Sequence, residues 1–315
     1  MGRFWIDGSQ ANEFLNWIHS NDVANMKYGK AKYGLICNEQ GGIIDDAIVY
    51  RLSETRHLLV ANAANADAIH QWLISWQEKR YKNVSITPAA ELPGMIAFQG
   101  PNALNTLSEL LTSSQIAEMR PFSLIVENFQ AQDIYVARTG YTGEDGVELM
   151  LGNAAAVSLW NTLIDLGVTP CGLGSRDTLR LEMNYALYGM DISKSTNPIE
   201  AGLGWITKFN KGDFIGRDAL LIEKNKIHRS RISFEMLDRA VPRHNYNIIV
   251  DGNVVGKVTS GTQSPSLNKG IGIGYIQIEH SSPGTEIYIE IRSTLKPGVI
   301  INPPFYKKGT VNIIY

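Results

Sequence analysis

The sequence predicts an α+β protein that ends in a small all-β domain, and two patterns carry this prediction. Up to residue 221, helices with a 3.6-residue apolar period alternate with short strands and hairpins, as expected of an α+β layer. After residue 228 only strand patterns remain, which indicates a β-barrel or a β-sandwich. The chain has 315 residues, more than one hydrophobic core usually fills, so we expect a region over residues 1–221 and a separate domain over residues 228–315.

Strands and helices alternate from the first residues onward. A strand over residues 2–8 precedes an amphipathic helix with Phe14 and Leu15 on its apolar side. Further strands are expected over residues 57–62, 95–99, 122–129 and 131–138. Helices are expected around residues 69–76, over 102–111 and over 154–166, the last packing Val157, Leu159, Trp160, Leu163 and Ile164.

A hairpin over residues 37–51 is the most informative stretch of the chain. Gly41-Gly42 can supply the positive φ values of a tight turn, and β-branched residues fill both arms. Asp45-Asp46 interrupts the second arm, although aspartate is depleted in strands and one of two neighbours must face the buried side. A carboxylate placed where it costs stability is a candidate for chemistry. A solvated acidic pair on an edge strand is the alternative, and this stretch alone does not decide between them.

Strands are the only regular elements expected at the C-terminal end. Five are expected, at residues 232–234, 247–250, 254–258, 270–275 and 286–291. Asp251-Gly252 predicts a tight hairpin turn between two of them. The alternating glycines of residues 270–274 lack the following helix of a dinucleotide fingerprint, so we expect them to face a crowded neighbour.

Composition and charge argue against several classes of function. A formal net charge of −2 gives no electrostatic basis for binding nucleic acid or an anionic membrane. No apolar run approaches the roughly 20 residues of a membrane helix, and no signal peptide is visible. The two cysteines, Cys37 and Cys171, suit a reducing cytosol or mitochondrial matrix, and Cys37 is expected to be buried. The six histidines are scattered, so we expect no metal site.

A glycine-rich segment over residues 139–146 lacks the Lys-Ser or Lys-Thr of a phosphate-binding loop. We interpret it as a turn that lets the backbone approach a flat ligand. Tyr141 could stack on such a ligand, and Glu148 could accept two N–H bonds from an amidine-like edge. A purely structural hairpin turn is the alternative.

Arg176 stands near the start of a helix that we expect Ser175 to cap, a position unfavourable for a positive charge. A ligand would help to explain this arginine. The alternative is a surface ion pair with Asp177 or Glu182.

Six segments, in order and spread over nearly the whole chain, resemble the aminomethyltransferase, or T-protein, family of the glycine cleavage system. They lie at residues 37–46 (CNEQGGIIDD), 98–101 (FQGP), 138–146 (RTGYTGEDG), 172–182 (GLGSRDTLRLE), 198–203 (PIEAGL) and 259–262 (TSGT). Such an ordered set is far more specific than any single motif.

The resemblance implies a three-domain, cloverleaf-like fold with a C-terminal β-barrel and tetrahydrofolate bound near the middle. It also implies a reaction, in which an aminomethyl group on the lipoyl arm of the H-protein is transferred to tetrahydrofolate. The products are ammonia, 5,10-methylenetetrahydrofolate and the reduced lipoyl protein. Tetrahydrofolate is then the one-carbon acceptor, no metal is expected, and the enzyme is placed in the cytoplasm, or in the mitochondrial matrix of a eukaryote.

The same resemblance makes Asp46 the functional acid, placed beside N10 of the folate. There a carboxylate can orient the amine nucleophile and stabilise positive charge on the iminium-like carbon. Strand alternation points Asp45 the other way, so we expect it to be structural. The positions that the resemblance associates with folate are Tyr33, Tyr50, Asn62, Tyr141, Glu148, Arg176 and Tyr185. Glu148 suits the N3–H and 2-amino edge of the pterin, and the tyrosines suit ring packing.

Two departures from the family pattern and two rival functions remain. First, family members carry a segment before the equivalent of Met1, so we expect part of the first domain to be absent. Second, a basic residue near the C-terminus often contacts folate in family members, but neither Lys307 nor Lys308 can be assigned that contact. A folate-dependent demethylase of the same fold would keep the folate pocket and change the residues that face the one-carbon donor. A non-catalytic folate-binding protein would carry a Lys-Gly-Cys signature, which this sequence lacks, and the intact Asp45-Asp46 pair also argues against it.

Overall fold

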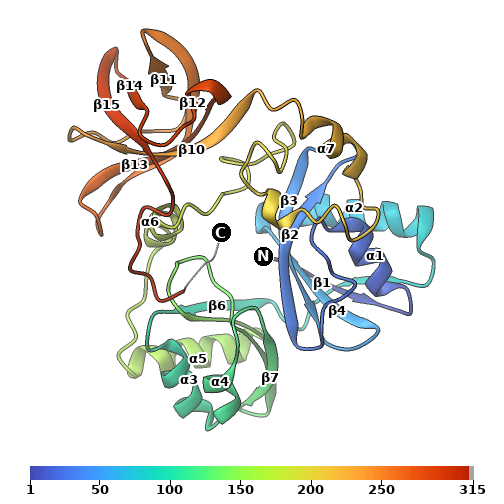
Figure 1. Ribbon diagram of the computed structural model, residues 1–315. Helices are drawn as coiled ribbons and strands as arrows, with labels where there is room; N and C mark the ends of the chain where they lie inside the picture. Colours follow the sequence, from blue (N-terminus) through green and yellow to red (C-terminus); the bar gives the residue numbers. More distant parts are fainter. Residues whose placement is uncertain (312–315) are drawn as a thin grey trace.

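Three β-sheets surround the centre of the molecule in the computed structural model, which describes residues 1–311 (Figure 1). Each sheet belongs to one lobe with its own hydrophobic core. The first lobe is blue in Figure 1, the second is mostly green, and the barrel at the C-terminal end is orange. This arrangement confirms the three-domain, α+β fold with a C-terminal barrel.

The first lobe is a five-stranded sheet, in the order β2-β3-β4-β1-β5, with helices packed on one face. Its strands are β1 (Gly2–Asp7), β2 (Lys30–Cys37), β3 (Ile43–Arg51), β4 (Arg56–Ala61) and β5 (Ser85–Pro88). Its helices are α1 (Ala11–Ile18), η1 (Ala63–Asn65) and α2 (Ala66–Arg80). The helical spacing of Phe14, Leu15 and Ile69 turns them toward the sheet, where all three are fully buried.

The turn between β2 and β3 uses its two glycines for different reasons. Only Gly41 has a positive φ, of 83°. A Cβ at Gly42 would collide with the carbonyl oxygen of Lys194, so this position needs glycine for the close approach of another chain segment. The expectation of positive φ at both glycines is therefore wrong for Gly42.

The second lobe is a four-stranded sheet in the order β6-β9-β8-β7. Its elements are β6 (Gly94–Gln99), α3 (Ala103–Leu111), α4 (Ser114–Glu118), β7 (Leu124–Phe129), β8 (Gln132–Ala137), β9 (Gly146–Leu151) and α5 (Asn153–Asp165). Helix α5 buries Leu159 and Leu163, but it leaves exposed Val157 (64%), Trp160 (42%) and Ile164 (40%). The prediction that these three pack inward is wrong, because only a narrow stripe of α5 meets the sheet.

The segment between the second lobe and the barrel returns to the first lobe. It contains α6 (Leu173–Glu182), η2 (Gly204–Ile206) and α7 (Arg217–Glu223). Phe214 and Leu220 pack there against Leu35 of β2. Helix α6 begins at Leu173 after the N-cap Gly172, so Ser175 lies inside the helix and does not cap it, contrary to expectation.

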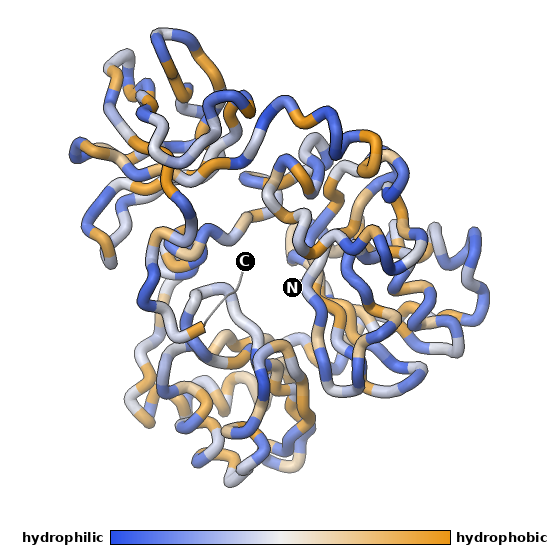
Figure 2. Tube along the Cα trace, viewed as in Figure 1, coloured by the Kyte–Doolittle hydropathy of each residue, from blue (hydrophilic) through white to orange (hydrophobic). Residues whose placement is uncertain are grey.

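The C-terminal strands close into a six-stranded barrel, in the order β10-β13-β12-β11-β14-β15. They are β10 (Arg229–Met236), β11 (Asn247–Val250), β12 (Asn253–Ser264), β13 (Lys269–Gln277), β14 (Glu286–Ile291) and β15 (Thr294–Ile301), with η3 (Ile278–His280) after β13. Hydrophobic and hydrophilic residues alternate along these strands, as expected when one face is buried (Figure 2). A Cβ at Gly272 would collide with the Phe234 ring, which confirms the crowded neighbour predicted for these glycines.

Candidate active site

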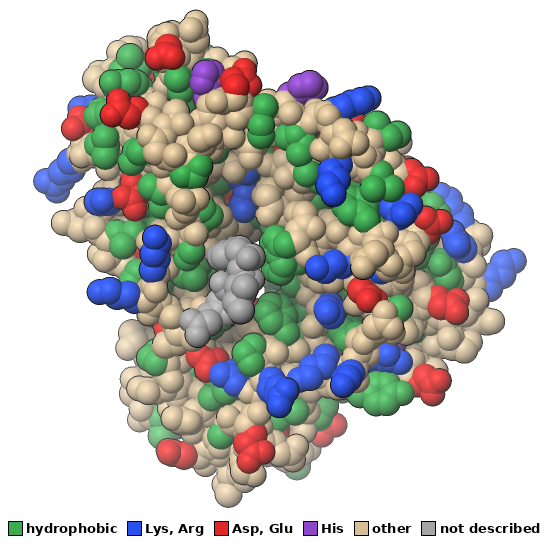
Figure 3. Space-filling view, in the orientation of Figure 1, with side chains coloured by type: hydrophobic (Ala, Val, Ile, Leu, Met, Phe, Trp, Pro, Cys, Tyr) green, Lys and Arg blue, Asp and Glu red, His purple; other side chains and the backbone are tan. Residues whose placement is uncertain are grey.

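A cavity of about 1180 Å³ lies where the three lobes meet. Its wall includes Asp46 from the first lobe, Glu148 from the second and Arg231 from the barrel. A pocket for one small ligand usually measures roughly 300–1,000 Å³, so this cavity has room for two reactants. Lys and Arg side chains form a row over the junction of the first and second lobes (Figure 3), so the net charge of −2 is not evenly spread.

Asp46 projects from β3 into this cavity and is held by two hydrogen bonds. Its Oδ2 accepts one from the Tyr33 hydroxyl (3.1 Å), and its Oδ1 accepts one from the Asn62 side-chain amide (2.8 Å). Burial and the charge of Asp45 together raise the pKa of Asp46 to about 6, although the two hydrogen bonds oppose the shift. Asp46 can therefore gain or lose a proton just below neutral pH, as a general base or acid must.

Asp45 is fully buried on the other side of β3, yet it is connected to Asp46 through Asn62. It accepts hydrogen bonds from the backbone N–H of Asn62 (3.1 Å) and from the side-chain Nδ2 (2.7 Å). The same Nδ2 is the donor to Asp46. Asp45 is buried and Asp46 lines the cavity, but one amide joins the two, which alternation along a single strand could not reveal.

Glu148 lies on β9, a central strand of the second lobe, and lines the cavity. Its Oε2 accepts a hydrogen bond from the Thr139 hydroxyl (2.5 Å). Burial raises the pKa of Glu148, while this hydrogen bond and the positive charge of Arg176 oppose the shift. A carboxylate held in this way has lone pairs left for N–H donors of a ligand.

Tyr50 supports this carboxylate from behind. It is 1% exposed, and its hydroxyl lies 3.0 Å from Thr139 Oγ1. Because the Thr139 hydroxyl gives its proton to Glu148, the Tyr50 hydroxyl must be the donor. Among the described residues, the cavity wall includes Thr139 and Glu148 but not Tyr50.

Tyr141, Tyr185 and Arg176 form the part of the wall next to Glu148. The rings of Tyr141 and Tyr185 are stacked, with centroids 5.5 Å apart and planes at 27°. The Arg176 guanidinium lies 4.7 Å from the Tyr141 ring centroid, a favourable cation–π position. Its charge also acts on Glu148.

Arg176 does not form the surface ion pair that was the alternative explanation for it. Asp177 instead binds Arg180 (2.8 Å), and Glu182 accepts hydrogen bonds from Ser264 (2.5 Å) and Ser266 (2.9 Å). Within residues 1–311, no carboxylate oxygen lies within 4.0 Å of the Arg176 guanidinium.

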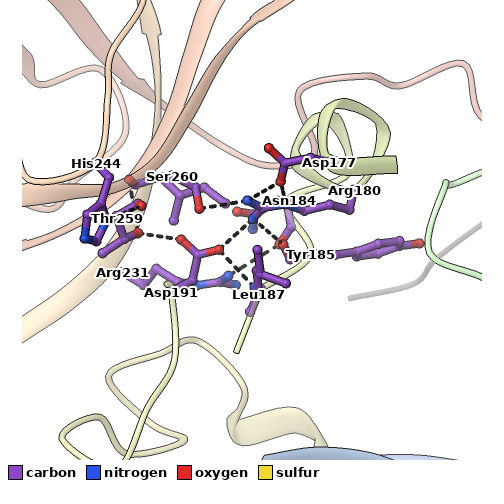
Figure 4. Close-up of polar contacts among 12 residues, drawn as sticks. Asp177, Arg180, Asn184, Tyr185, Leu187, Asp191, Arg231, His244, Thr259 and Ser260 are labelled. Carbon is purple, nitrogen blue, oxygen red and sulfur yellow. Dashed lines mark hydrogen bonds and ion pairs between the residues drawn. The ribbon is translucent and has the colours of Figure 1, made fainter. Parts of the chain in front are cut away.

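A buried ionic cluster joins α6 to the barrel, and the sequence-based reasoning did not single it out (Figure 4). Arg180 and Asp191 form an ion pair at 2.6 Å, with side chains 3% and 0% exposed. Arg180 also donates to Ser260 (2.8 Å), and Thr259 donates to Asp191 (2.5 Å). The family-like segments 172–182 and 259–262 contain three of these residues, so those segments were the available signal.

The predicted site residues therefore fall into two groups on one cavity, with Tyr50 behind one of them. The first group is Tyr33, Asp46 and Asn62, and the second is Tyr141, Glu148, Arg176 and Tyr185. Arg231 also lines the cavity, although the sequence analysis did not single it out.

Other candidate features of the described chain carry no chemistry here. Burial raises the pKa of the Cys37 thiol to about 12, so this cysteine is unreactive, as predicted. Over residues 1–311, no group of three or more His, Cys, Asp or Glu side chains is placed to hold a metal ion. No helix in that part of the chain is long and apolar enough to cross a membrane.

Comparison with known proteins agrees with this geometry. The GCVT N-terminal domain family matches residues 1–211, and the glycine cleavage T-protein C-terminal barrel domain family matches residues 229–307. An aminomethyltransferase from Phocaeicola vulgatus is 42% identical over 98% of this chain and 86% of its own length. One from Oceanobacillus iheyensis is 39% identical over 98% of this chain and 85% of its own length.

A solved structure shares the fold over nearly the whole chain. The glycine cleavage system aminomethyltransferase T from Bartonella henselae superimposes with a TM-score of 0.90 at 31% identity, covering 98% of this chain and 84% of its own. Together these similarities define an enzyme of the folate-dependent transferase class. More particularly, the chain belongs to the aminomethyltransferase family, the T-proteins of the glycine cleavage system, as the resemblance predicted.

Proposed function

We propose that this chain transfers the aminomethyl carbon from the lipoyl arm of the H-protein to tetrahydrofolate, with Asp46 as the working carboxylate. The observation that carries the proposal is the setting of Asp46, which faces a cavity of about 1180 Å³ and has a pKa raised to about 6. Tyr33 and Asn62 hold its two oxygens in place.

Ionised Asp46 can act on both partners of the transfer. When the carbon–sulfur bond of the donor breaks, its electron pair stays on sulfur and the carbon becomes iminium-like. A fixed carboxylate in a site with little water stabilises that positive charge. When one folate amine then bonds to this carbon, its nitrogen must lose a proton, which a group with a pKa near 6 can accept and pass to the amino group. That amino group leaves as ammonia when its bond to the carbon breaks, and the second folate nitrogen bonds to the carbon and loses its proton, which completes the methylene bridge.

The second group of residues is proposed to hold the folate. Glu148 accepts the N3–H and 2-amino hydrogens of the pterin, a paired arrangement of two N–H donors on one carboxylate. Tyr141, Tyr185 and Arg176 offer flat surfaces to the rings, and the charge of Arg176 favours the ionised form of Glu148 against the effect of burial. Tyr50 acts through Thr139 and does not touch the ligand.

The test compares Asp46→Asn with the parent enzyme in an assay with aminomethylated H-protein and tetrahydrofolate. Asparagine keeps the shape but lacks the charge, so we expect turnover to fall by about 100-fold or more, while calorimetry finds tetrahydrofolate affinity within a few-fold of the parent. Asp133→Asn, which changes an exposed carboxylate on β8, is the matched control. Unchanged turnover of Asp46→Asn would remove the catalytic role.

The same assay separates the two rival functions. Offered a methyl-sulfonium or N-methyl donor in place of the H-protein, a demethylase would form a methylated folate, and we expect none. A non-catalytic folate-binding protein would give no methylenetetrahydrofolate with either donor.

We also propose that the enzyme acts in the cytoplasm, since both cysteines are free.

A further inference from the structure

Arg231 is a cavity arginine that no carboxylate of the described chain neutralises. It extends from β10 and is partly buried. Its Nη1 donates one long hydrogen bond to the backbone oxygen of Asn184 (3.4 Å). Within residues 1–311, no carboxylate oxygen lies within 4.0 Å of this guanidinium. Since arginine carries five N–H donors, most of its capacity is open to a ligand.

Two carboxylate residues on segments beside Arg231 are engaged elsewhere. Asp191 pairs with Arg180 (2.6 Å), and Glu200 pairs with Arg229 (2.8 Å). Arg231 is therefore not a member of a structural ion pair. Its charge instead reaches the cavity, where it lowers the pKa of Tyr33 against the effect of burial.

The wall of the cavity that carries Glu148 and Arg231 also carries aromatic rings. Tyr141 next to Glu148 stacks on Tyr185, and Tyr185 follows Asn184, to which Arg231 is bonded. Figure 4 shows the Tyr185 ring extending away from the Arg180–Asp191 cluster, while Arg231 reaches the backbone of Asn184. The cavity wall thus offers a carboxylate, two aromatic rings and a guanidinium that pairs with no carboxylate of the described residues.

Tetrahydrofolate carries a complementary group for each of these. Its pterin edge offers N–H donors, its aminobenzoyl ring is flat, and its glutamyl tail ends in carboxylates. Arg176 cannot serve the tail while Glu148 holds the pterin, because Arg176 lies against Tyr141 at the Glu148 end.

We propose that Arg231 binds the carboxylates of the glutamyl tail, and that this contact lets the enzyme distinguish tetrahydrofolate from folates without a tail. The inference rests on the proposed function and adds a specificity-determining residue to it. A guanidinium is suited to this role because its planar fork can donate two parallel hydrogen bonds to one carboxylate.

The experiment measures calorimetric affinities of the full chain for tetrahydrofolate and for tetrahydropteroate, which lacks the glutamate. We expect the parent to bind tetrahydrofolate about tenfold more tightly, the lower end for a charge-assisted contact at a partly exposed site. Arg231→Leu should lose this preference and bind tetrahydropteroate as the parent does. Arg231→Lys, which keeps the charge but loses the fork, should retain part of the preference. Arg239→Leu removes an exposed arginine of the same barrel and should change neither affinity.

Each outcome is decisive. Equal affinity of the parent for the two compounds, or an undiminished preference in Arg231→Leu, would overturn the inference while leaving the proposed function intact. Equal weakening of both compounds by Arg231→Leu would also overturn it, because Arg231 would then act on the fold or the pterin. Should leucine prevent folding, Arg231→Gln gives the same comparison. A parent that binds neither compound would overturn the proposed function itself.

Discussion

Asp46 should make the folded protein less stable when it is ionised, and Asp46→Asn should recover that stability. Burial and the charge of Asp45 raise the pKa of Asp46 from 3.8 to about 6. At about 1.4 kcal/mol per pH unit, this difference corresponds to about 3 kcal/mol above pH 7. Asparagine keeps an acceptor oxygen but loses one of the two hydrogen bonds, which offsets about 1 kcal/mol. We therefore expect a net gain in the free energy of unfolding of about 1–3 kcal/mol.

The gain should depend on pH in one direction. Below pH 3.8 the carboxyl is neutral in both the folded and the unfolded chain, so the parent and the variant differ little. As the pH rises from 3.8 through about 6, the unfolded chain releases its proton first, and the parent loses stability relative to the variant. The difference should be small near pH 4 and complete above pH 7.

Differential scanning calorimetry of the parent, Asp46→Asn and Asp133→Asn at pH 4 and pH 8 measures this effect. At pH 8 the Tm of Asp46→Asn should exceed that of the parent by about 2–6 °C. Asp133 is exposed, so its variant should match the parent at both values. A Tm below that of the parent at pH 8, or a difference that does not change with pH, would refute the reasoning.

Three further substitutions test the site and its support. Asn62→Ala removes the hydrogen-bond donor that the two aspartates share. The acid midpoint of the pH–rate profile should therefore rise by about one pH unit. An unmoved midpoint would contradict the role of Asn62. Glu148→Gln should weaken tetrahydrofolate binding by about tenfold or more in calorimetry, whereas an affinity equal to that of the parent would place the pterin elsewhere. Asp191→Ala removes the buried partner of Arg180 and leaves it only the exposed Asp177, so it should cost about 3–5 kcal/mol in urea unfolding. A loss under about 1 kcal/mol would mean that the cluster is not structural.

Local patterns located the elements whose neighbours in the chain are also their neighbours in space. The strands at residues 247–250 and 286–291 were predicted with their observed bounds, and Asp251-Gly252 forms the expected turn. Strand β15 was missed because Pro297 and Gly298 weaken its pattern. It forms as the closing strand of the barrel, through pairing with β14 and with the distant β10, which no local window contains. The division at residues 221 and 228 stays a prediction.

The site was predictable only as far as the resemblance reached. The residues alone left Asp45-Asp46 open between chemistry and a solvated edge, and the choice of Asp46 came from the family pattern. The link through Asn62 depends on the pairing of β3 with β4. Because Asn62 follows Asp46 by 16 residues, no local sequence pattern around Asp46 indicates the link. The folate contacts of the seven other positions stay predictions.

The arrangement of these two acids explains why a fully buried carboxylate is present at all. The Asn62 side-chain amide has two hydrogens, and it uses one on Asp45 (2.7 Å) and one on Asp46 (2.8 Å). Asp45 also accepts the Asn62 backbone N–H, so the amide cannot turn without breaking a hydrogen bond at each end. The burial of Asp45 costs stability, but it fixes the direction of the hydrogen that Asp46 receives. Asp45, Asn62 and Asp46 therefore form one hydrogen-bonded unit, although strand alternation separates the two acids.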